Sequence, residues 1–195
     1  MIPLTPTTSL PTPFGTFQAY VYSDDAMEHL VLVMGNIENV QNLLVRVHSE
    51  CLTGDVFGSK RCDCGSQLSL ALEQIAAEGE GIFIYLRGQE GRGIGLRHKL
   101  QAYALQDKGL DTVEANLELG FPPDGREYKV SAQILTALGI TTIRLMTNNP
   151  AKYEELEAHG LKVIERVPLI TSPTPENSHY LKTKKEKLGH IFDTF

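Results

Sequence analysis

Hydrophobic and polar positions alternate along the chain in blocks that predict short strands and amphipathic helices. Short apolar runs predict strands at residues 17–22, 30–34, 43–48, 82–86, 142–146 and 162–167. Helical spacing of apolar residues predicts helices at residues 67–77, 96–106 and 128–138. Asn149 followed by Pro150 is typical of a helix start, and this last helix is expected to end near Gly160.

The order of these elements predicts the fold class. Strands that alternate with helices in the second half favour an α/β fold, and consecutive strands in the first half indicate a mixed sheet. We therefore expect a layered α/β fold, with a mixed β-sheet flanked by helices. Neither an internal repeat nor a linker is evident, so residues 1–195 are predicted to form a single domain.

The remaining segments are expected to lack regular structure. Residues 1–13 are rich in Pro and Thr and are predicted to form an extended arm. Residues 51–63 are expected to be a loop, residues 88–95 a glycine-rich loop, and residues 111–126 irregular. Residues 171–195 form a polar C-terminal tail that we expect to pack loosely, with the lysines at 182, 184, 185 and 187 in solvent.

Composition narrows the class of protein. Of 195 residues, 42% are hydrophobic and 22% are charged, which is typical of a soluble globular protein. The formal net charge of −6 disfavours a nucleic-acid partner. The first residues do not resemble a signal peptide, and no apolar run approaches the roughly 20 residues of a membrane span. We therefore expect a cytoplasmic protein that binds neither nucleic acid nor membrane.

Three cysteines form the strongest local signal. Cys51, Cys62 and Cys64 are spaced C-x10-C-x-C, and thiolates in a reducing compartment select zinc. Three protein ligands leave a fourth position for water, which is the pattern of a catalytic zinc that lowers the pKa of its bound water to about 7. The alternative is a structural site that His48 or another side chain completes.

Residues before Cys51 offer proton chemistry. His48 and Glu50 precede the first cysteine directly, and a carboxylate or imidazole beside a metal-bound water can move protons. The alternative is structural: Glu50 pairs with Arg46 or Arg61, and His48 packs within a strand.

Two further segments have the character of phosphate sites. Residues 87–96 (RGQEGRGIGL) follow a predicted strand and combine glycines with two arginines, and glycines let a backbone approach a phosphate closely. Residues 147–152 (TNNPAK) place a hydroxyl and a lysine around a helix start. Each could also be an ordinary turn or cap. Two such segments beside one metal site indicate a multiply charged ligand such as a nucleoside triphosphate.

Several long motifs resemble the GTP cyclohydrolase II family. They are residues 46–55 (RVHSECLTGD), 61–67 (RCDCGSQ), 90–96 (EGRGIGL) and 145–152 (LMTNNPAK), and the resemblance extends from residue 10 to residue 190. It implies an enzyme that opens the imidazole ring of GTP and releases formate and pyrophosphate. The implied product is 2,5-diamino-6-ribosylamino-4(3H)-pyrimidinone 5′-phosphate, in the first step of riboflavin biosynthesis.

The resemblance also implies a set of site residues. Cys51, Cys62 and Cys64 match the zinc ligands. The positions that match GTP-binding residues are Arg46, Val47, His48, Ser49, Glu50, Gln67, Glu90, Gly91, Arg92, Thr112, Thr147 and Lys152. The implied cofactors are one Zn²⁺ per subunit and Mg²⁺ with the GTP phosphates, and the implied assembly is a homodimer.

Three positions match catalytic residues of the family. Asp124 matches a proton acceptor, Arg126 a nucleophile toward the α-phosphate, and Tyr103 an active-site tyrosine. An arginine is protonated under nearly all conditions and is a poor nucleophile. The alternative is therefore that Arg126 stabilises charge on the α-phosphate while water attacks.

One departure and three rival functions accompany this interpretation. Gly88 is an additional residue relative to short bacterial members, and the loop resembles that of longer, bifunctional members that also carry 3,4-dihydroxy-2-butanone 4-phosphate synthase. A nucleobase deaminase is one rival, because His48-x-Glu50 resembles part of its zinc motif, although the Cys-x-x-Cys half is absent. The others are a family member that performs only part of the reaction, and a zinc-stapled RNA-binding module.

Overall fold

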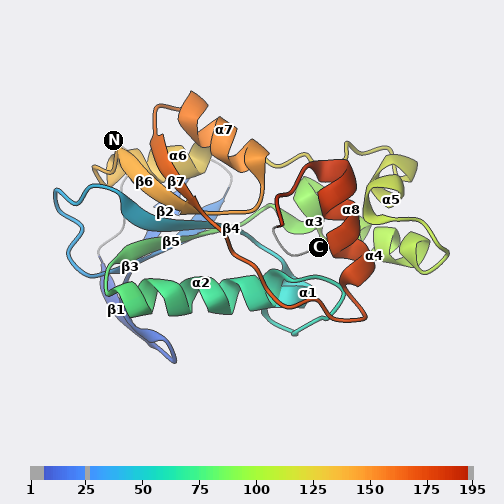
Figure 1. Ribbon diagram of the computed structural model, residues 1–195, viewed down its shortest axis with the longest axis horizontal. Coiled ribbons are helices and arrows are strands. Elements are labelled where there is room, and N and C mark those ends of the chain that lie inside the picture. The colour runs from blue at the N-terminus through green and yellow to red at the C-terminus, as the bar shows by residue number, and fades with distance from the viewer. Residues whose placement is uncertain (1–6, 25–26, 193–195) are drawn as a thin grey trace.

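One seven-stranded sheet organises the computed structural model, which describes residues 7–24 and 27–192 (Figure 1). Its strands are β1 (Thr8–Thr12), β2 (Gly15–Ser23), β3 (Glu28–Met34), β4 (Leu43–Ser49), β5 (Gly81–Leu86), β6 (Thr142–Met146) and β7 (Lys162–Val167). The helices are α1 (Leu52–Asp55), α2 (Cys64–Glu78), α3 (Glu90–Gly93), α4 (Gly95–Gln106), α5 (Thr112–Glu118), α6 (Lys129–Ala137), α7 (Pro150–Ala158) and α8 (Ser178–Leu188).

The sheet is mixed, as predicted. Its strand order is β1-β2-β3-β5-β4-β6-β7. The pairs from β1 to β5 are antiparallel, whereas β5, β4, β6 and β7 run parallel to one another. The change occurs where the chain switches from hairpins to strands that alternate with helices, because parallel neighbours need a long crossover connection. The predicted layered α/β fold is confirmed.

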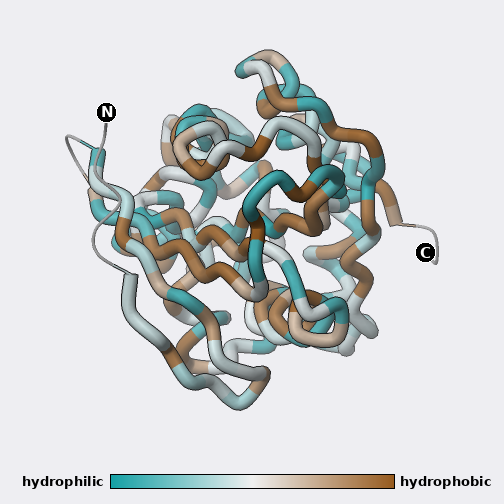
Figure 2. The backbone as a smooth tube through the Cα atoms, turned by 90° about the vertical axis from the view of Figure 1, so that its left-hand side faces the viewer, coloured by the Kyte–Doolittle hydropathy of each residue, from teal (hydrophilic) through white to brown (hydrophobic). Residues whose placement is uncertain are grey.

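Helices cover both faces of the sheet. Figure 1 shows α2 along one face and α6 with α7 on the opposite face. Ile75 of α2 packs with Phe83 and Leu44 in one core cluster, whereas Ile134 of α6 packs with Ile84 in the other. Figure 2 shows hydrophobic segments running through the middle of the molecule along the strands. Alternate residues of the central strands therefore serve opposite cores, as the two-residue period requires.

The carboxyl ends of β4, β5 and β6 lie side by side at one edge of the sheet. The segments that leave these three strands are residues 50–63, 87–95 and 147–149. Figure 1 shows α3, α4, α5 and α8 gathered beyond this edge. Ligands of open α/β sheets bind outside the carboxyl ends of the strands, so we expect the functional site at this edge.

Three predictions of irregular structure were wrong. Residues 51–63 contain α1, and residues 111–126 contain α5, which Asp111 and Glu114 cap reciprocally. Residues 171–195 contain α8, so its described part is no loose tail, and Lys184 is buried instead of solvated. These helices are short and carry few apolar residues, so their stability comes from caps and tertiary contacts that periodicity does not reveal.

The part of the predicted arm that the structure describes is extended and pairs with β2, whereas residues 1–6 lie outside the described residues. Residues 193–195 of the predicted tail also lie outside them. Within the described chain, the helices are all too short or too polar to cross a membrane.

We expect removal of the Asp111 carboxylate to destabilise the protein at neutral pH more than in acid. Burial would raise the pKa of Asp111, but hydrogen bonds from Lys187 and from backbone amides outweigh it, so the pKa is lowered. A carboxyl group with a lowered pKa stabilises the fold above its unfolded pKa of about 4 and loses this effect as pH falls through the folded pKa. Asp111→Ala should therefore cost about 1–2 kcal/mol of unfolding free energy at neutral pH.

Urea unfolding of wild type and variant at neutral pH and near pH 3 measures this difference. Asp111→Asn is the matched control, because it keeps a capping oxygen and loses the charge, and it should cost less at neutral pH. A loss of equal size at both pH values would contradict the contribution of the charge.

Candidate active site

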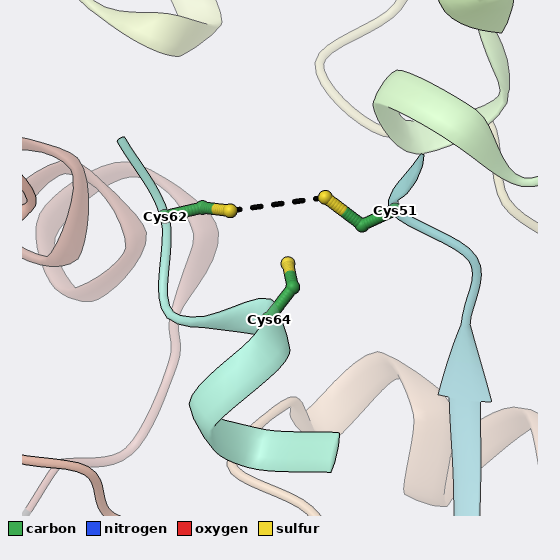
Figure 3. A group of neighbouring side chains, drawn as sticks. All are labelled: Cys51, Cys62 and Cys64. Atoms are coloured by element: carbon green, nitrogen blue, oxygen red, sulfur yellow. Dashed lines mark hydrogen bonds between the residues drawn. The ribbon is translucent and has the colours of Figure 1, made fainter. Parts of the chain in front are cut away.

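Three thiols lie together where the segment after β4 meets the start of α2. Figure 3 shows the sulfur of Cys51, which follows β4, directed toward Cys62 and Cys64. The sulfurs of Cys51 and Cys62 are 3.7 Å apart, and all three sulfurs lie within 4.8 Å of one another. The three residues are free cysteines, so each sulfur is available as a ligand.

This arrangement fits a zinc ion. Tetrahedral geometry with Zn–S bonds of about 2.3 Å separates two sulfurs by about 3.8 Å, close to the distance between Cys51 and Cys62. Hydrogen bonds with Cys62 and Cys64, together with the Lys99 ammonium, lower the pKa of Cys51 and favour the thiolate that binds metal. Within the described residues the group contains three cysteines and no further ligand. The donor set therefore suits a zinc that retains one open position.

Two glycines allow the backbone to approach the thiols. A Cβ atom on Gly54 would lie 2.9 Å from the Cys62 sulfur and 3.1 Å from the Cys51 sulfur. A Cβ atom on Gly65 would lie 2.4 Å from the carbonyl oxygen of Gly54. The absence of both side chains lets α1 pack on the start of α2, which brings the first cysteine to the other two.

His48 is linked to the backbone of Cys51 through Asp55 and is not part of the group formed by the three cysteines. Its Nε2 lies 3.0 Å from Oδ1 of Asp55, and its ring stacks on Phe83 and Tyr85. The other oxygen of Asp55 accepts hydrogen bonds from the Cys51 amide at 2.9 Å and the Tyr85 hydroxyl at 2.8 Å. The structure therefore does not support His48 as a fourth metal ligand, and the imidazole packs within its strand.

Glu50 is directed toward the glycine-rich loop. Its carboxylate accepts a hydrogen bond from the Gly88 amide at 2.8 Å, while Arg46 and Arg61 have other partners. The predicted alternative of an ion pair between Glu50 and either arginine is therefore wrong. Gly88 has a φ of +77°, which glycine adopts without strain. The additional residue thus makes a turn that presents its amide to Glu50.

A buried ion pair connects the glycine-rich loop to the thiols. The Lys99 ammonium lies 2.5 Å from one oxygen of Glu90 and 3.1 Å from the Cys51 sulfur. The other oxygen of Glu90 accepts a hydrogen bond from the Leu52 amide at 2.7 Å. Burial would lower the pKa of Lys99, but Glu90 and the Cys51 thiolate outweigh it and raise that pKa, so Lys99 stays protonated.

Arg92 has a strained backbone and an unpaired side-chain group. Its φ of 64° and ψ of 40° lie in the left-handed region, which costs a non-glycine residue about 1–2 kcal/mol. The side chain is buried, and its Nη2 has no hydrogen-bond partner. A buried unpaired donor at a strained position is a feature of binding sites, since a ligand can supply the missing acceptor.

Tyr103 extends from α4 into the same pocket. Burial raises the pKa of Tyr103 to about 12, so its hydroxyl keeps its proton at neutral pH and can donate a hydrogen bond. The Arg61 guanidinium lies 4.8 Å from the centre of its ring, and the Lys99 ammonium lies 5.7 Å from it. The cysteines, Glu90, Arg92, Lys99 and Tyr103 line one pocket, which we call the thiol pocket.

A second pocket adjoins the thiol pocket and is lined by basic side chains. We call it the cationic pocket, and its lining includes Arg46, Gln67, Arg126, Thr147, Lys152, Tyr180, Lys184 and His190. Ser49, Cys64, Arg126 and Tyr180 line both pockets, so the two are parts of one continuous site.

Arg46 and Lys152 are almost completely buried in the cationic pocket. Arg46 donates to the Met146 carbonyl at 2.9 Å and to the Gln67 side chain at 2.8 Å, while its Nε has no partner. Lys152 donates to the Val47 carbonyl at 2.7 Å. Burial lowers the pKa of Arg46 to about 10, and burial together with Arg46 and Arg126 lowers that of Lys152 well below its usual range. An anionic ligand would relieve this repulsion.

Arg126 stands at the junction of the two pockets. Its Nε donates to one oxygen of Asp124 at 2.8 Å, and its Nη2 donates to the other at 2.5 Å. Burial would lower the pKa of Arg126, but Tyr128 and Asp124 outweigh it and raise that pKa, while the guanidinium lowers the pKa of Asp124. The pair therefore consists of a charged arginine and a charged carboxylate.

Most predicted site residues are brought together. The thiol pocket collects Ser49, Glu50, Cys51, Cys62, Cys64, Glu90, Gly91, Arg92, Tyr103, Thr112 and Arg126. The cationic pocket adds Arg46, His48, Gln67, Thr147 and Lys152. Asp124 lines neither pocket but forms an ion pair with Arg126, which lines both. Val47 is fully buried in the core and contributes its carbonyl oxygen instead of its side chain.

Comparison with known proteins identifies the family. A family described as GTP cyclohydrolase II matches residues 4–168. The chain belongs to the GTP cyclohydrolase II family. It is 59% identical over 185 residues to the monofunctional riboflavin biosynthesis protein RIBA 3, chloroplastic, of Arabidopsis thaliana, covering 94% of this chain and 36% of that protein.

Other relatives show the same pattern of partial coverage. The bifunctional riboflavin biosynthesis protein RIBA 1, chloroplastic, of Arabidopsis thaliana is 58% identical over 185 residues, which cover 94% of this chain and 34% of that protein. The riboflavin biosynthesis protein RibBA of Salinispora arenicola is 57% identical over 186 residues, which cover 94% of this chain and 44% of that protein. The chain thus spans less than half the length of these relatives.

Several residues of the site were not predicted from the sequence. Lys99, Tyr180, Lys184 and His190 line the pockets but belong to no motif that suggested chemistry. Lys99 could have been found by its position on the predicted helix after the glycine-rich loop. The other three come from a segment that was interpreted as a solvated tail.

We expect Gly54→Ala to reduce zinc binding by the three cysteines. The added Cβ would press on the sulfurs of Cys51 and Cys62, and the cysteines would separate. Zinc content after equilibration with a competing chelator measures the effect, and we expect at least a tenfold weaker affinity, or about 1.4 kcal/mol.

Val56→Ala is the control, because Val56 lies in the same segment and is 65% exposed. Zinc affinity equal to wild type in Gly54→Ala, with the fold intact by circular dichroism, would contradict the role given to this glycine.

We expect Arg92→Gly to retain or increase stability while weakening GTP binding. Glycine removes the left-handed strain, which is worth about 1 kcal/mol, and also removes a buried unpaired donor. Urea unfolding and equilibrium GTP binding measure the two effects, and affinity should fall at least tenfold. Arg97→Ala, an exposed position on α4, is the control. Unchanged GTP affinity would show that the strain at Arg92 serves no binding role.

Proposed function

We propose that this chain catalyses the GTP cyclohydrolase II reaction. In that reaction the imidazole ring of GTP is opened by hydrolysis, formate and pyrophosphate are released, and 2,5-diamino-6-ribosylamino-4(3H)-pyrimidinone 5′-phosphate is formed. This is a first step of riboflavin biosynthesis, and the riboflavin names of the relatives support the proposal. The main observation in support of this reaction is that the thiol pocket and the cationic pocket adjoin and share lining residues.

The thiol pocket is suited to the guanine end of the substrate. Cys51, Cys62 and Cys64 would hold zinc, which when bound supplies a water activated at neutral pH. Tyr103 keeps its proton at neutral pH and would donate a hydrogen bond to the purine ring or to a water beside it. Glu50 lines the same pocket and provides a carboxylate for proton transfer.

The cationic pocket is suited to the triphosphate. Arg46, Lys152 and Arg126 line it, and their mutual repulsion in a buried setting favours a ligand with several negative charges. The unpaired Nε of Arg46 offers a further donor. Thr147 and Lys152 lie beside the start of α7, where the helix dipole also attracts phosphate. Mg²⁺ would accompany the phosphates, as it does with most nucleotides.

Arg126 would contact the α-phosphate because it lies where the two pockets meet. Its two hydrogen bonds to Asp124 and its raised pKa keep the guanidinium protonated. A protonated guanidinium has no free electron pair for attack, so of the two roles we propose that Arg126 stabilises charge on the phosphate. Asp124 orients it and would accept a proton from the attacking group. The homodimer and the cytoplasmic location stay predictions.

Product analysis tests the proposed function. Zinc-loaded protein is incubated with Mg²⁺ and GTP, formate and pyrophosphate are quantified, and the nucleotide product is identified by mass. We expect formate, pyrophosphate and the diamino-pyrimidinone product in equal amounts. Pyrophosphate without formate would exclude ring opening by this chain. Absence of GTP turnover would overturn the proposal, and release of ammonia from a purine nucleotide would favour the deaminase alternative.

A further inference from the structure

The family match ends before the last elements of the chain. It covers residues 4–168, whereas α8 and the residues that follow it lie beyond residue 177. Figure 1 shows α8 at the edge of the sheet where the site lies, and α8 contacts α3 through Tyr180 and Arg92 and α5 through Lys187 and Glu114. Tyr180 lines both pockets, and Lys184 and His190 line the cationic pocket. A segment outside the family match therefore contributes three side chains to the site.

Contacts hold α8 against several segments that carry site residues. Lys184 forms an ion pair of 2.8 Å with Asp63, which lies between two of the cysteines. Lys187 forms ion pairs with Asp111 and Glu114 at the start of α5.

The ends of this segment are fixed as well. The Ile191 amide donates to the Asn148 carbonyl at 2.9 Å, in the segment after β6. The Arg92 guanidinium lies 5.7 Å from the centre of the Tyr180 ring. These contacts place α8 over the junction of the two pockets.

Lys184 has the features of a ligand-binding cation and not only of a structural one. Its side chain is 9% exposed, and among the described residues Asp63 is the acceptor of its hydrogen bond. An ammonium carries three N–H donors, so donors remain for a ligand. Its charge also acts on Lys152 and His190 across the cationic pocket. Gln67 donates to the other oxygen of Asp63 at 2.5 Å, so Asp63 is held by two side chains, of which only Lys184 carries a charge.

We propose that Lys184 is a phosphate-binding residue, and that α8 completes the substrate site with Tyr180 as the wall between its two pockets. The ligand class is an oligophosphate chain, such as the triphosphate of a nucleotide. This inference rests on the proposed function for its substrate, while the oligophosphate recognition itself rests on Arg46, Lys152 and Lys184 in one pocket. Lys184 adds a cation from a part of the chain that no site motif covers.

Binding and steady-state kinetics of Lys184→Met in the zinc-loaded full chain test the proposal. Loss of a charge-assisted hydrogen bond to phosphate should raise KM for GTP about tenfold to a hundredfold, with a smaller change in kcat. Inorganic tripolyphosphate should bind the variant more weakly by a similar factor, and guanosine should bind it as it binds wild type. Lys182→Met on the same helix is the matched control, because the Lys182 side chain is 69% exposed, and it should behave as wild type.

A double variant separates phosphate binding from support of Asp63. Lys184→Met leaves Asp63 buried without its cation, so Asp63→Asn combined with Lys184→Met removes that imbalance. We expect the double variant to keep its zinc and to retain the raised KM and the weak tripolyphosphate binding. Recovery of both to within twofold of wild type would overturn the proposal, since Lys184 would then act only through Asp63.

The tripolyphosphate measurement also keeps the two proposals distinct. If wild-type protein binds tripolyphosphate but does not turn over GTP, the proposed function fails and the comparison of Lys184→Met with wild type still tests Lys184. If wild type turns over GTP and Lys184→Met matches it in KM and in tripolyphosphate affinity, the proposed function stands and the role of Lys184 is wrong.

Discussion

The position of β4 between β5 and β6 is the constraint on which the site depends. All three strands are parallel, so their carboxyl ends meet at one edge, and the segments that leave them carry the first cysteine, the glycine-rich loop and the Thr147–Lys152 turn. Residues separated by about a hundred positions become neighbours through this pairing, as the hydrogen bond from Lys152 to the Val47 carbonyl shows. Without the parallel register, neither pocket would form.

Charge burial is the second constraint, and it shapes the two pockets in opposite ways. In the thiol pocket, the buried Lys99 ammonium has anionic partners, because it contacts both Glu90 and the Cys51 sulfur. In the cationic pocket, Arg46 and Lys152 hydrogen-bond to carbonyls and an amide. Removing a charge from water costs several kcal/mol, and neutral partners compensate only in part. The pocket is therefore built for an anion that arrives with the ligand.

Much of this arrangement could be predicted from the sequence, because local patterns encode it. The strands at residues 142–146 and 162–167 follow from short apolar runs, and the helix after Asn149 follows from its cap and Pro150. The cysteine spacing alone indicated a metal site. Family motifs then assigned Arg46, Arg92 and Lys152, although periodicity would place such residues simply on strands and loops.

Other features were missed because apolar periodicity does not register them. α5 begins at a capping box of Asp111 and Glu114, which is a local signal, and Lys187 forms ion pairs with both carboxylates. Lys184 has the same sequence environment as Lys182 and Lys185, so composition gives no reason to bury one and expose another. Its environment is fixed by Asp63, more than a hundred residues away in sequence. The sequence of this lysine-rich helix therefore predicts a solvated helix, and only the contact with Asp63 shows that Lys184 is buried.

Arg126 links the two constraints. It lies at the junction of the thiol pocket and the cationic pocket, and Asp124 neutralises it on one side only. A ligand that spans both pockets passes Arg126. A negatively charged group of that ligand at the junction would meet a guanidinium that two hydrogen bonds to Asp124 already orient. Orientation before binding lowers the reorganisation needed during reaction, which is the main way that fixed charges accelerate chemistry at phosphorus. The Arg126 side chain is 15% exposed and lines both pockets together with Tyr180, so water is partly excluded from this charge and weakens it less than at an open surface.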